Sequence, residues 1–385
     1  MLRVMTIYGT RPESIKVAPV IRAIDDAEDM ENIVVITGQH REMVDQVNEL
    51  FGIVPDHDLD IMREGQTLNQ IAARVIAGVD AILEAEQPDL VIVQGDTTTV
   101  AGAAFAAFNR RVRVVHLEAG LRSGNNDSPF PEEANRRIAT QVATLHLAPT
   151  ASSKANLIAE GIAEDTIVVT GNSVIDTLLH VASLEGIAFE DRRLQALRER
   201  KECSDSRVLL VTTHRRENLG GAMTSIGRAI ADIAVAYPEL TIVLPLHPNP
   251  EIRGAIEPHI SGLRNVFLLD ALPYAQFNLL LALADIVLTD SGGVQEEAPS
   301  LGKPVLVMRD NTERPEAVEA GTVKLVGTDR ATIVAEVSRL LDTACAYESM
   351  ANAVNPYGDG FASERTVAAI RWMFRAGARP RDFSQ

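Results

Sequence analysis

Three acidic residues in the first half of the chain stand where apolar segments end. Asp96 follows the apolar run 90–94, and Glu118 follows the run 112–117. Glu132 comes directly after a loop-like stretch rich in Gly, Asn, Asp and Pro. Acids that meet at strand ends can act as general acids and bases once their surroundings separate their pKa values. The three residues therefore predict proton abstraction from a carbon that holds its proton tightly.

Two of these acids also have a purely structural interpretation. Asp96 stands at a strand-to-helix turn, where aspartate commonly caps the helix. Glu132 would lie in the first turn of the next helix, where it can pair with the helix dipole or with Arg136 four residues later. Glu118 has no such role, because it stands at the exit of an apolar strand. Catalysis and binding without catalysis both stay open unless the acids converge.

Two basic residues near the N-terminus are placed for an anion. The first apolar run, 4–8, leads into a Gly turn and then into a helix start that carries Arg11 and Lys16. Free backbone N–H groups at a helix start attract phosphate, and the two side chains add positive charge. A phosphate site and a plain capped helix with solvated charges are equally compatible with this pattern.

A histidine follows an apolar run in the second half of the chain. The run 209–213 leads directly into His214, Arg215 and Arg216. Because histidine titrates near neutral pH and arginine is always charged, this group suits a dianionic ligand. The alternative is a charged surface loop. His247, in a Pro-rich turn, is a weaker candidate of the same kind.

The most specific local pattern is a strand-like run that meets Ser291, Gly292 and Gly293 and then a helix. Small residues let a diphosphate approach the unpaired N–H groups at the positive end of a helix. Glu297, one turn into that helix, can accept hydrogen bonds from ribose hydroxyls. The pattern predicts a nucleotide diphosphate site.

Two further residues are weaker candidates for the same site. Arg314 follows the apolar run 305–308, where it offers a positive charge or is simply a solvated loop residue. Phe277 can stack on a nucleobase, although an aromatic residue on an apolar helix usually belongs to the core.

The elements that must hold these residues alternate along the chain. Short β-branched runs are separated by longer, Ala-rich amphipathic stretches, which predicts parallel sheets covered by helices on both faces. The series restarts after a charged helix, so we expect an α/β protein with two Rossmann-like, doubly wound domains. They would span 1–180 and 200–362, with a helix in 363–385 that can cross back onto the first domain. Ligands of open α/β sheets bind at the carboxyl ends of strands, which favours a cleft between the domains.

Composition argues against several classes of protein. The chain has 385 residues and a formal net charge of -17, which disfavours nonspecific binding to nucleic acid or to an anionic membrane. No apolar stretch approaches the ~18 residues of a membrane-spanning helix, and no leader precedes the first strand, so we expect a cytoplasmic protein. We expect Cys203 and Cys345 to be buried thiols. No His, Cys and carboxylate cluster has metal-ligand spacing, so we expect neither a metal nor a cofactor.

Together these segments resemble the non-hydrolysing UDP-N-acetylglucosamine 2-epimerases over nearly the whole chain. The resemblance rests on stretches that occur in order: GTRPESIK at 9–16, GQHREM at 38–43, GDTTT at 95–99, HLEAGLR at 116–122, SPFPEEANR at 128–136, HRREN at 214–218, DSGGVQEEAPSLGK at 290–303 and ERPE at 313–316. The family implies two Rossmann-like domains of the type called GT-B, with a UDP-sugar in the cleft and the UDP held mainly by the second domain.

The resemblance also implies roles for individual residues. Asp96, Glu118 and Glu132 match the acid and base carboxylates of the family, and His214 matches the histidine that assists departure and return of UDP. The residues that match contacts to the nucleotide sugar are Arg11, Lys16, Arg136, Ser291, Gly292, Gly293, Glu297 and Arg314, with Phe277 near the uracil. Gln46 and His247 match a second, activating site that some bacterial relatives have.

The implied reaction interconverts UDP-N-acetylglucosamine and UDP-N-acetylmannosamine by eliminating UDP to 2-acetamidoglucal and adding it back. It would supply N-acetylmannosamine units for cell-surface polysaccharide, with the UDP-sugar as partner and a homodimer as the assembly. The alternatives are an enzyme for a modified UDP-sugar, a hydrolysing epimerase that releases free N-acetylmannosamine, and a GT-B glycosyltransferase. Three strand-end acids favour epimerisation over glycosyl transfer, which needs an acceptor site and no proton exchange.

Overall fold

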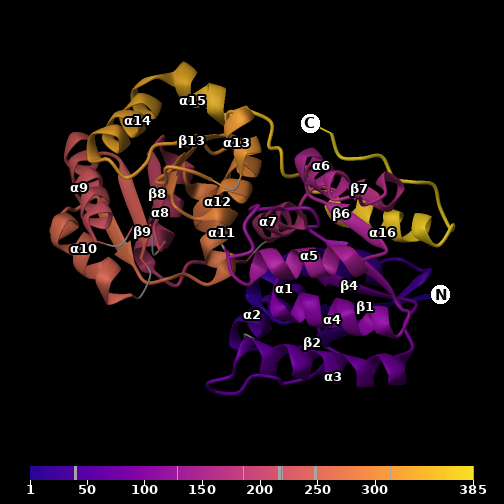
Figure 1. Ribbon diagram of the computed structural model, residues 1–385. Helices are drawn as coiled ribbons and strands as arrows, with labels where there is room; N and C mark the ends of the chain where they lie inside the picture. The colour runs from indigo at the N-terminus through magenta and orange to yellow at the C-terminus, as the bar shows by residue number, and fades with distance from the viewer. Residues whose placement is uncertain are drawn as a thin grey trace. The chain divides into compact units, whose positions relative to one another are not determined.

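The computed structural model describes residues 1–38, 41–127, 129–184, 186–215, 218, 220–246, 249–312 and 314–384, without the side chains of residues 41 and 42. Within these ranges the chain forms two compact units (Figure 1). The first unit comprises Met1–Thr177 together with Tyr357–Ser384, and the second comprises Leu178–Pro356.

The described residues of the first unit form a seven-stranded parallel sheet in the order β3-β2-β1-β4-β5-β6-β7. Its strands are β1 (Leu2–Tyr8), β2 (Met30–Ile36), β3 (His57–Asp58), β4 (Leu90–Gln94), β5 (Arg113–Leu117), β6 (Leu145–Ala148) and β7 (Ile167–Val169). The helices of this part of the chain are α1 (Arg11–Asp25), α2 (Arg41–Phe51), α3 (Leu68–Glu86), α4 (Thr98–Asn109), α5 (Glu132–Val142), α6 (Ala151–Ala159), the short 3-10 helix Glu164–Thr166, α7 (Ser173–Ser183) and α16 (Ala362–Met373).

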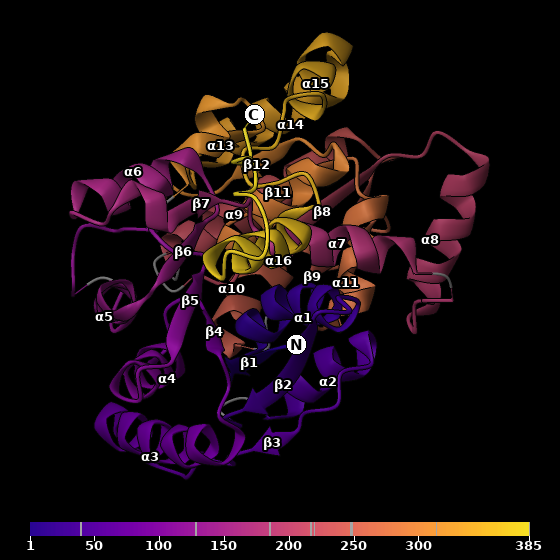
Figure 2. The ribbon, with the colours of Figure 1, turned by 90° about the vertical axis from the view of Figure 1, so that its right-hand side faces the viewer.

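Both faces of this sheet are apolar, as helical layers on both sides require. Val4 and Tyr8 of β1 belong to one buried cluster, which includes residues of α1 and α16. Met5 and Ile7 of the same strand belong to another, which includes residues of α3 and α4. Successive side chains of a strand point to opposite faces, so the near-continuous apolar strands predicted from sequence bury two layers at once. The C-terminal helix α16 lies against α1 (Figure 2).

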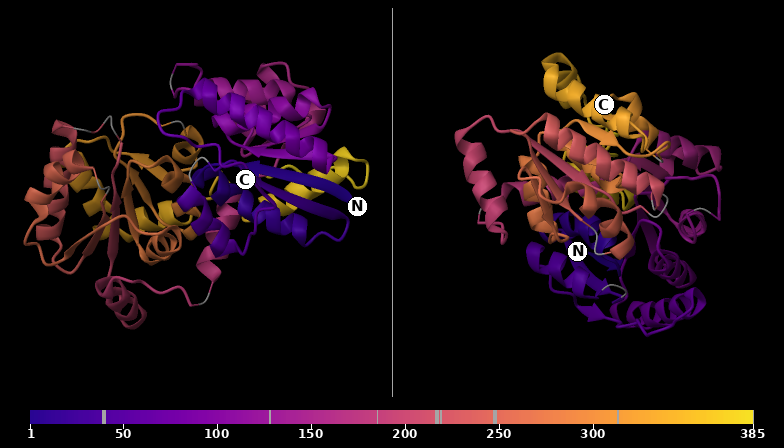
Figure 3. Two further views of the ribbon diagram at one scale, coloured as in Figure 1. Left: turned by 90° about the horizontal axis from the view of Figure 1, so that it is seen from below. Right: turned by 90° about the vertical axis from the view of Figure 1, so that its left-hand side faces the viewer.

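The described residues of the second unit form a six-stranded parallel sheet in the order β10-β9-β8-β11-β12-β13. Its strands are β8 (Val208–Thr212), β9 (Thr241–Pro245), β10 (Val266–Leu269), β11 (Ile286–Thr289), β12 (Val305–Val307) and β13 (Val323–Leu325). Its helices are α8 (Arg192–Cys203), α9 (Gly221–Ala236), α10 (Pro250–Ile260), α11 (Tyr274–Leu283), α12 (Gly292–Glu297), the 3-10 helix Ala298–Leu301, α13 (Pro315–Glu319), α14 (Arg330–Asp342) and α15 (Ala344–Ala351). Helices α9, α10 and α14 bury their apolar sides on one face of this sheet (Figure 3, right).

Each sheet has a topological switch point, where the chain stops adding strands on one side of the first strand and continues on its other side. In the first sheet the switch lies between β1 and β4, and in the second it lies between β8 and β11. Ligands of open α/β sheets bind outside the carboxyl ends of strands at such points. The predicted fold class, α/β with doubly wound parallel sheets, is confirmed, and the residues that leave β1, β4, β8 and β11 are the ones to inspect.

Two other observations bear on the sequence expectations. Cys203 and Cys345 are both exposed, so the expectation of buried thiols is wrong. Among the described residues, no helix combines the length and the apolar character that crossing a membrane would need.

Candidate active site

Helix α1 begins at Arg11, directly after β1, and a buried carboxylate holds its start. Glu13 is 2 % exposed, and its Oε2 accepts hydrogen bonds from the backbone N–H groups of Gly9 (2.7 Å) and Thr10 (2.8 Å). Its Oε1 accepts the hydroxyl of Thr97, in the turn that leaves β4. The N–H groups of Gly9 and Thr10 are therefore already engaged by Glu13, and a phosphate site at Arg11 and Lys16 stays a prediction. Glu13 instead ties the exits of β1 and β4 together.

Glu118, at the exit of β5, has an unusual backbone and three polar partners. Its φ is 61°, in the left-handed region that non-glycine residues rarely adopt outside sites that need them there. Its Oε2 accepts a hydrogen bond from Gln94 (2.5 Å), the last residue of β4, and its Oε1 accepts one from Asn172 (3.1 Å). Lys16, from α1, forms an ion pair with Oε1. With its side chain only 8 % exposed, Glu118 is held from three different elements.

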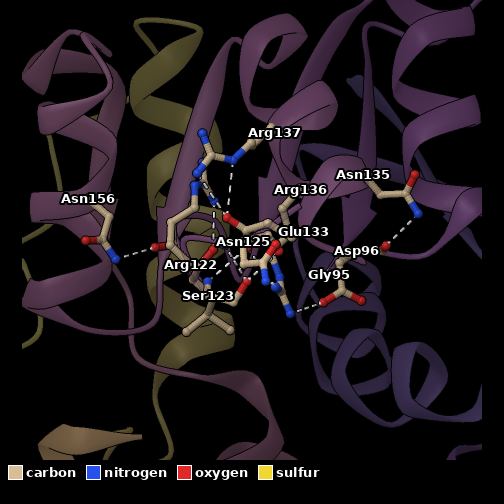
Figure 4. Close-up of polar contacts among 12 residues, drawn as sticks. Gly95, Asp96, Arg122, Ser123, Asn125, Glu133, Asn135, Arg136, Arg137 and Asn156 are labelled. Carbon is tan, nitrogen blue, oxygen red and sulfur yellow. Dashed lines mark hydrogen bonds and ion pairs between the residues drawn. The ribbon is translucent and has the colours of Figure 1, made fainter. Parts of the chain in front are cut away.

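Asp96, at the exit of β4, is fixed by two neighbours on α5 (Figure 4). The side chain of Arg136 reaches its Oδ2 (2.5 Å), and the amide of Asn135 donates to its backbone carbonyl (2.9 Å). The helix cap predicted for Asp96 belongs to Thr97, whose hydroxyl accepts the N–H of Val100 (3.4 Å). The purely structural interpretation of Asp96 is therefore wrong.

The pKa of Asp96 depends on its burial and on the charged residues around it. Burial raises the pKa of its carboxyl group above the ordinary value, and the negative charges of Glu118 and Glu132 raise it further. The positive charges of Arg136 and Lys16 oppose this rise in pKa. The three predicted acids and two of the predicted basic residues are thus brought together at one end of the first sheet.

Glu132 is the first residue of α5, and its Oε2 is buried without a hydrogen-bond partner among the described residues. The pairing expected of it falls to its neighbour Glu133. Glu133 is fully buried, accepts the N–H of Ser123 (2.9 Å) and pairs with Arg136 (3.2 Å), as Figure 4 shows. A buried carboxylate oxygen with no partner is costly, which makes Glu132 a candidate for contact with a ligand.

At the switch point of the second sheet, His214 leaves β8 and Asp290 leaves β11. Asp290 is fully buried, and its Oδ1 lies 3.2 Å from Nδ1 of the His214 ring. The ring itself is 44 % exposed. Although burial acts in the opposite direction, hydrogen bonds from His214, Arg215 and Thr213 hold the pKa of Asp290 below its ordinary value. His214 therefore stands beside a negative charge and is not simply part of a charged surface loop.

The predicted nucleotide residues follow Asp290. Ser291 precedes α12, and Gly292 is buried under the guanidinium of Arg314, where an added Cβ would lie 2.6 Å from Nη1. Arg314 is held by Glu296, whose Oε1 accepts from its Nε (2.6 Å). Glu297 is 7 % exposed and Gly293 is exposed. Arg314 is thus a placed cation and not a solvated loop residue.

The remaining predicted residues are less well placed by the structure. Phe277 is half-buried on α11, and Gln46 is exposed on α2. His247 lies outside the described residues. Arg11 begins α1 and is half-buried. Across the described ranges, no three His, Cys, Asp or Glu side chains form a group that could hold a metal ion.

Sequence reasoning missed the residues that hold the acids in place. Gln94 and Asn172 on Glu118, Asn135 on Asp96, and Asp290 beside His214 were not singled out. A polar last residue in an otherwise apolar strand, as at Gln94, is the one signal that could have found such a residue. Asn172 gave none, because its contact with Glu118 joins positions 54 residues apart in the chain.

The fold and the two switch points define the class of protein. Two doubly wound parallel sheets place convergent acid and base groups at one switch point and a buried aspartate–histidine pair at the other. This is an α/β protein with the GT-B-like fold.

Comparison with known proteins identifies the family. Residues 22–371 match the family model described as UDP-N-acetylglucosamine 2-epimerase. A relative from Ralstonia nicotianae, named probable UDP-N-acetylglucosamine 2-epimerase, is 49% identical over 374 residues, which are 97% of this chain and 100% of the relative. The chain belongs to the UDP-N-acetylglucosamine 2-epimerase family, and it is an isomerase.

Solved structures agree with this membership. The crystal structure of a protein from Listeria monocytogenes, described as a putative UDP-N-acetylglucosamine 2-epimerase, has a TM-score of 0.93 and 44% identity, with 100% of both chains covered. The UDP-GlcNAc 2-epimerase from Neisseria meningitidis, solved bound to UDP-GlcNAc, has a TM-score of 0.85 and 46% identity over 96% of this chain and 99% of that one.

Proposed function

We propose that this enzyme interconverts UDP-N-acetylglucosamine and UDP-N-acetylmannosamine by reversible inversion at carbon 2 of the sugar. The observation that carries the proposal is the convergence of Asp96, Glu118 and Glu132, because inversion at a carbon needs one group to remove its proton and one to return it. The substrate comes from the family and from the Neisseria relative, which was solved with UDP-GlcNAc.

In the proposed route, one carboxylate takes the proton from carbon 2 while the bond between carbon 1 and the phosphate oxygen of UDP breaks. The electron pair of the broken C–H bond forms the double bond of 2-acetamidoglucal, and UDP leaves with the electrons of the C–O bond. UDP then adds back to carbon 1, and a proton is delivered to the opposite face of carbon 2. Nothing is consumed, so the reaction balances as an isomerisation.

The acids of the first unit suit the two proton transfers. Burial raises the pKa of Asp96, whereas Glu118 accepts hydrogen bonds from Gln94 and Asn172 and pairs with Lys16, so the surroundings of the two groups differ. Neighbouring carboxyl groups with separated pKa values are the usual way in which one site supplies an acid and a base. Lys16 and Arg136 would balance the negative charge that the acids and the departing UDP bring.

The residues of the second unit suit the nucleotide. In this proposal His214 assists the departing diphosphate, while Ser291, Gly292, Gly293 and Arg314 bind its oxygens. Glu297 accepts hydrogen bonds from the ribose, and Phe277 lies near the uracil. The product would supply N-acetylmannosamine units for cell-surface polysaccharide.

Proton NMR of the purified enzyme with UDP-N-acetylglucosamine in deuterated water, without added metal, tests the proposal. The expected result is UDP-N-acetylmannosamine that carries deuterium at carbon 2. Release of free N-acetylmannosamine and UDP would make the enzyme a hydrolysing epimerase. An unchanged substrate without exchange would overturn the proposal and direct attention to modified UDP-sugars or to glycosyl transfer.

A further inference from the structure

Asp290 is a carboxylate that the reaction above leaves unused, and it accepts several hydrogen bonds. It is fully buried at the exit of β11. Its Oδ2 accepts hydrogen bonds from the Thr213 hydroxyl (2.9 Å), the Arg215 N–H (3.0 Å) and the Asn218 amide (3.1 Å). All three donors belong to the loop that leaves β8, so this oxygen holds that loop against β11.

The other carboxylate oxygen of Asp290, Oδ1, contacts the ring of His214. Oδ1 lies 3.2 Å from Nδ1 of His214, and it also shares the His214 backbone N–H with Oδ2, at 3.1 and 3.0 Å. Oδ2 already accepts hydrogen bonds from three donors of the loop. The contact of Oδ1 with the ring is therefore an additional feature, and it acts on the one side chain of the loop that is predicted to take part in the reaction.

We propose that Asp290 is a positioning residue for His214: its carboxylate accepts the Nδ1–H of the ring, so that Nε2 is the nitrogen presented to the leaving diphosphate. The proposal rests on the function proposed above, in which His214 assists UDP. A carboxylate at Nδ1 fixes the tautomer and the orientation of an imidazole and stabilises its protonated form. Because the ring is 44 % exposed, its other edge remains accessible to a ligand.

The geometry also explains why Asp290 is ionised although it is buried. Every contact described for Asp290 comes from a hydrogen-bond donor, which favours its ionised form even though it is fully buried. In this proposal, His214 with both ring nitrogens protonated donates Nδ1–H to Asp290 and presents its Nε2 proton to the diphosphate. That proton can be donated to a phosphate oxygen as the C–O bond breaks and taken back as UDP returns.

A double-mutant cycle separates positioning of His214 from a general role in the loop. Asp290→Asn in the otherwise unchanged enzyme is expected to lower kcat about 10- to 100-fold with little change in KM. In a His214→Asn background the same substitution is expected to change kcat less than twofold, because the ring that Asp290 positions is absent. Equal losses in both backgrounds would overturn the proposal.

Thr213→Val is the matched control, because it removes another hydrogen bond to Asp290 without touching the His214 ring. Its kcat is expected to stay within about twofold of the wild type. If Thr213→Val lowers kcat as much as Asp290→Asn does, the carboxylate acts only by holding the loop and the proposal fails.

A measurement on the wild type keeps the proposal testable if Asp290→Asn does not fold. Nitrogen-15 NMR of histidine-labelled enzyme, with His214 identified by its absence in His214→Asn, reports which ring nitrogen carries hydrogen. The expected neutral form is protonated at Nδ1, and the Nε2–H tautomer would overturn the proposal. This result can be read even if no epimerisation is found, so failure of the inference and failure of the proposed function are distinguishable.

Discussion

The two sheets place an aspartate at the same topological position and give it opposite properties. Asp96 leaves β4, the strand beside β1, and Asp290 leaves β11, the strand beside β8. The side chain of Asp96 is 24 % exposed and that of Asp290 is fully buried. Yet the pKa of Asp96 is raised and the pKa of Asp290 is lowered. Burial acts to raise the pKa of both groups, so the hydrogen-bond donors around Asp290 account for the difference.

The difference lies in what each loop offers to the carboxylate. Asp96 meets one guanidinium, from Arg136, and two other acids close enough to oppose its ionisation. Asp290 meets backbone N–H groups, a hydroxyl and an amide, and every one of them favours the charged form. One switch point therefore leaves an acid able to exchange a proton, whereas the other uses its acid to hold a loop and a histidine.

The largest effect is expected from substituting the three acids of the first unit, and it tests whether they move protons. Asp96→Asn, Glu118→Gln and Glu132→Gln should each lower kcat about 10²- to 10⁴-fold, because each removes a group that moves a proton. UDP should still bind to all three variants, since the residues proposed to bind the diphosphate, the ribose and the uracil belong to the second unit. Initial rates by NMR together with calorimetric titration of UDP measure both quantities. A variant that keeps the wild-type rate would remove its residue from the catalytic set.

Substituting the two aspartates should change stability in opposite directions. Asp96 has a raised pKa, so its contribution to stability is present below the ordinary value of 3.8 and is lost as the pH rises through the raised pKa. Asp290 has a lowered pKa, so its contribution is present above 3.8 and is lost as the pH falls through the lowered value. At pH 7, Asp96→Asn should therefore stabilise the protein and Asp290→Asn should destabilise it.

Urea denaturation at pH 7 measures both changes in stability. Asp290→Asn replaces one carboxylate oxygen by an NH2 group, which cannot accept the hydrogen bonds that this oxygen accepts. Each donor left unsatisfied costs about 1–3 kcal/mol. The gain from Asp96→Asn should disappear below pH 3.8, where the wild-type side chain is protonated in both states. The exposed Asp205→Asn is a control with an unchanged midpoint. Shifts of the same sign for Asp96→Asn and Asp290→Asn would contradict the comparison.

His116 shows what burial does to a pKa when hydrogen bonds do not outweigh it. His116, on β5, is fully buried, and its Nε2 lies 2.8 Å from the carbonyl oxygen of Gly95. Burial lowers its pKa to about 4, so the folded protein keeps it neutral. The unfolded chain takes up the proton near pH 6.5, and this residue therefore contributes stability above 6.5 that is lost as the pH falls toward 4.

Comparing the wild type with His116→Gln isolates this effect. Glutamine can still donate to the Gly95 carbonyl but does not titrate. The difference in unfolding free energy between the two proteins should change by about 3 kcal/mol between pH 7 and pH 4, with the wild type losing more on acidification. Denaturation curves at several pH values measure it. Curves that shift in parallel for both proteins would mean that His116 does not titrate in this range.

Much of the fold could be predicted from the sequence, and the failures share a cause. The predicted run 90–94 has the same bounds as β4, because a central strand buried on both faces is a continuous apolar run. The strands β3, β7 and β13 were missed. All three lie at sheet edges and span two or three residues each, so pairing with a neighbour defines them and composition does not.

The candidate site was likewise predicted in part: its chemical groups were found, and the contacts that hold them were not. The acids and His214 were predicted because chemistry-bearing side chains at strand ends stand out in the sequence. The left-handed backbone of Glu118 and its contact with Asn172 leave no such pattern, since they depend on contacts between distant segments. Position in the sheet is therefore readable from the sequence, whereas the pKa and orientation of a residue are properties of the assembled loops.

The smallest expected effect tests whether those unpredicted contacts matter. Gln94→Met removes the hydrogen bond to Glu118 at nearly constant side-chain volume. The freed carboxylate should sample more orientations, and kcat should fall about 10-fold with KM unchanged, since the reacting geometry is sensitive to small displacements. Gln195→Met is the matched control, because it removes a glutamine-to-glutamate hydrogen bond within α8 and should leave kcat unchanged. An unchanged kcat in Gln94→Met would mean that the other contacts of Glu118 are enough to hold it. A raised KM would instead point to a role for Gln94 in binding the sugar.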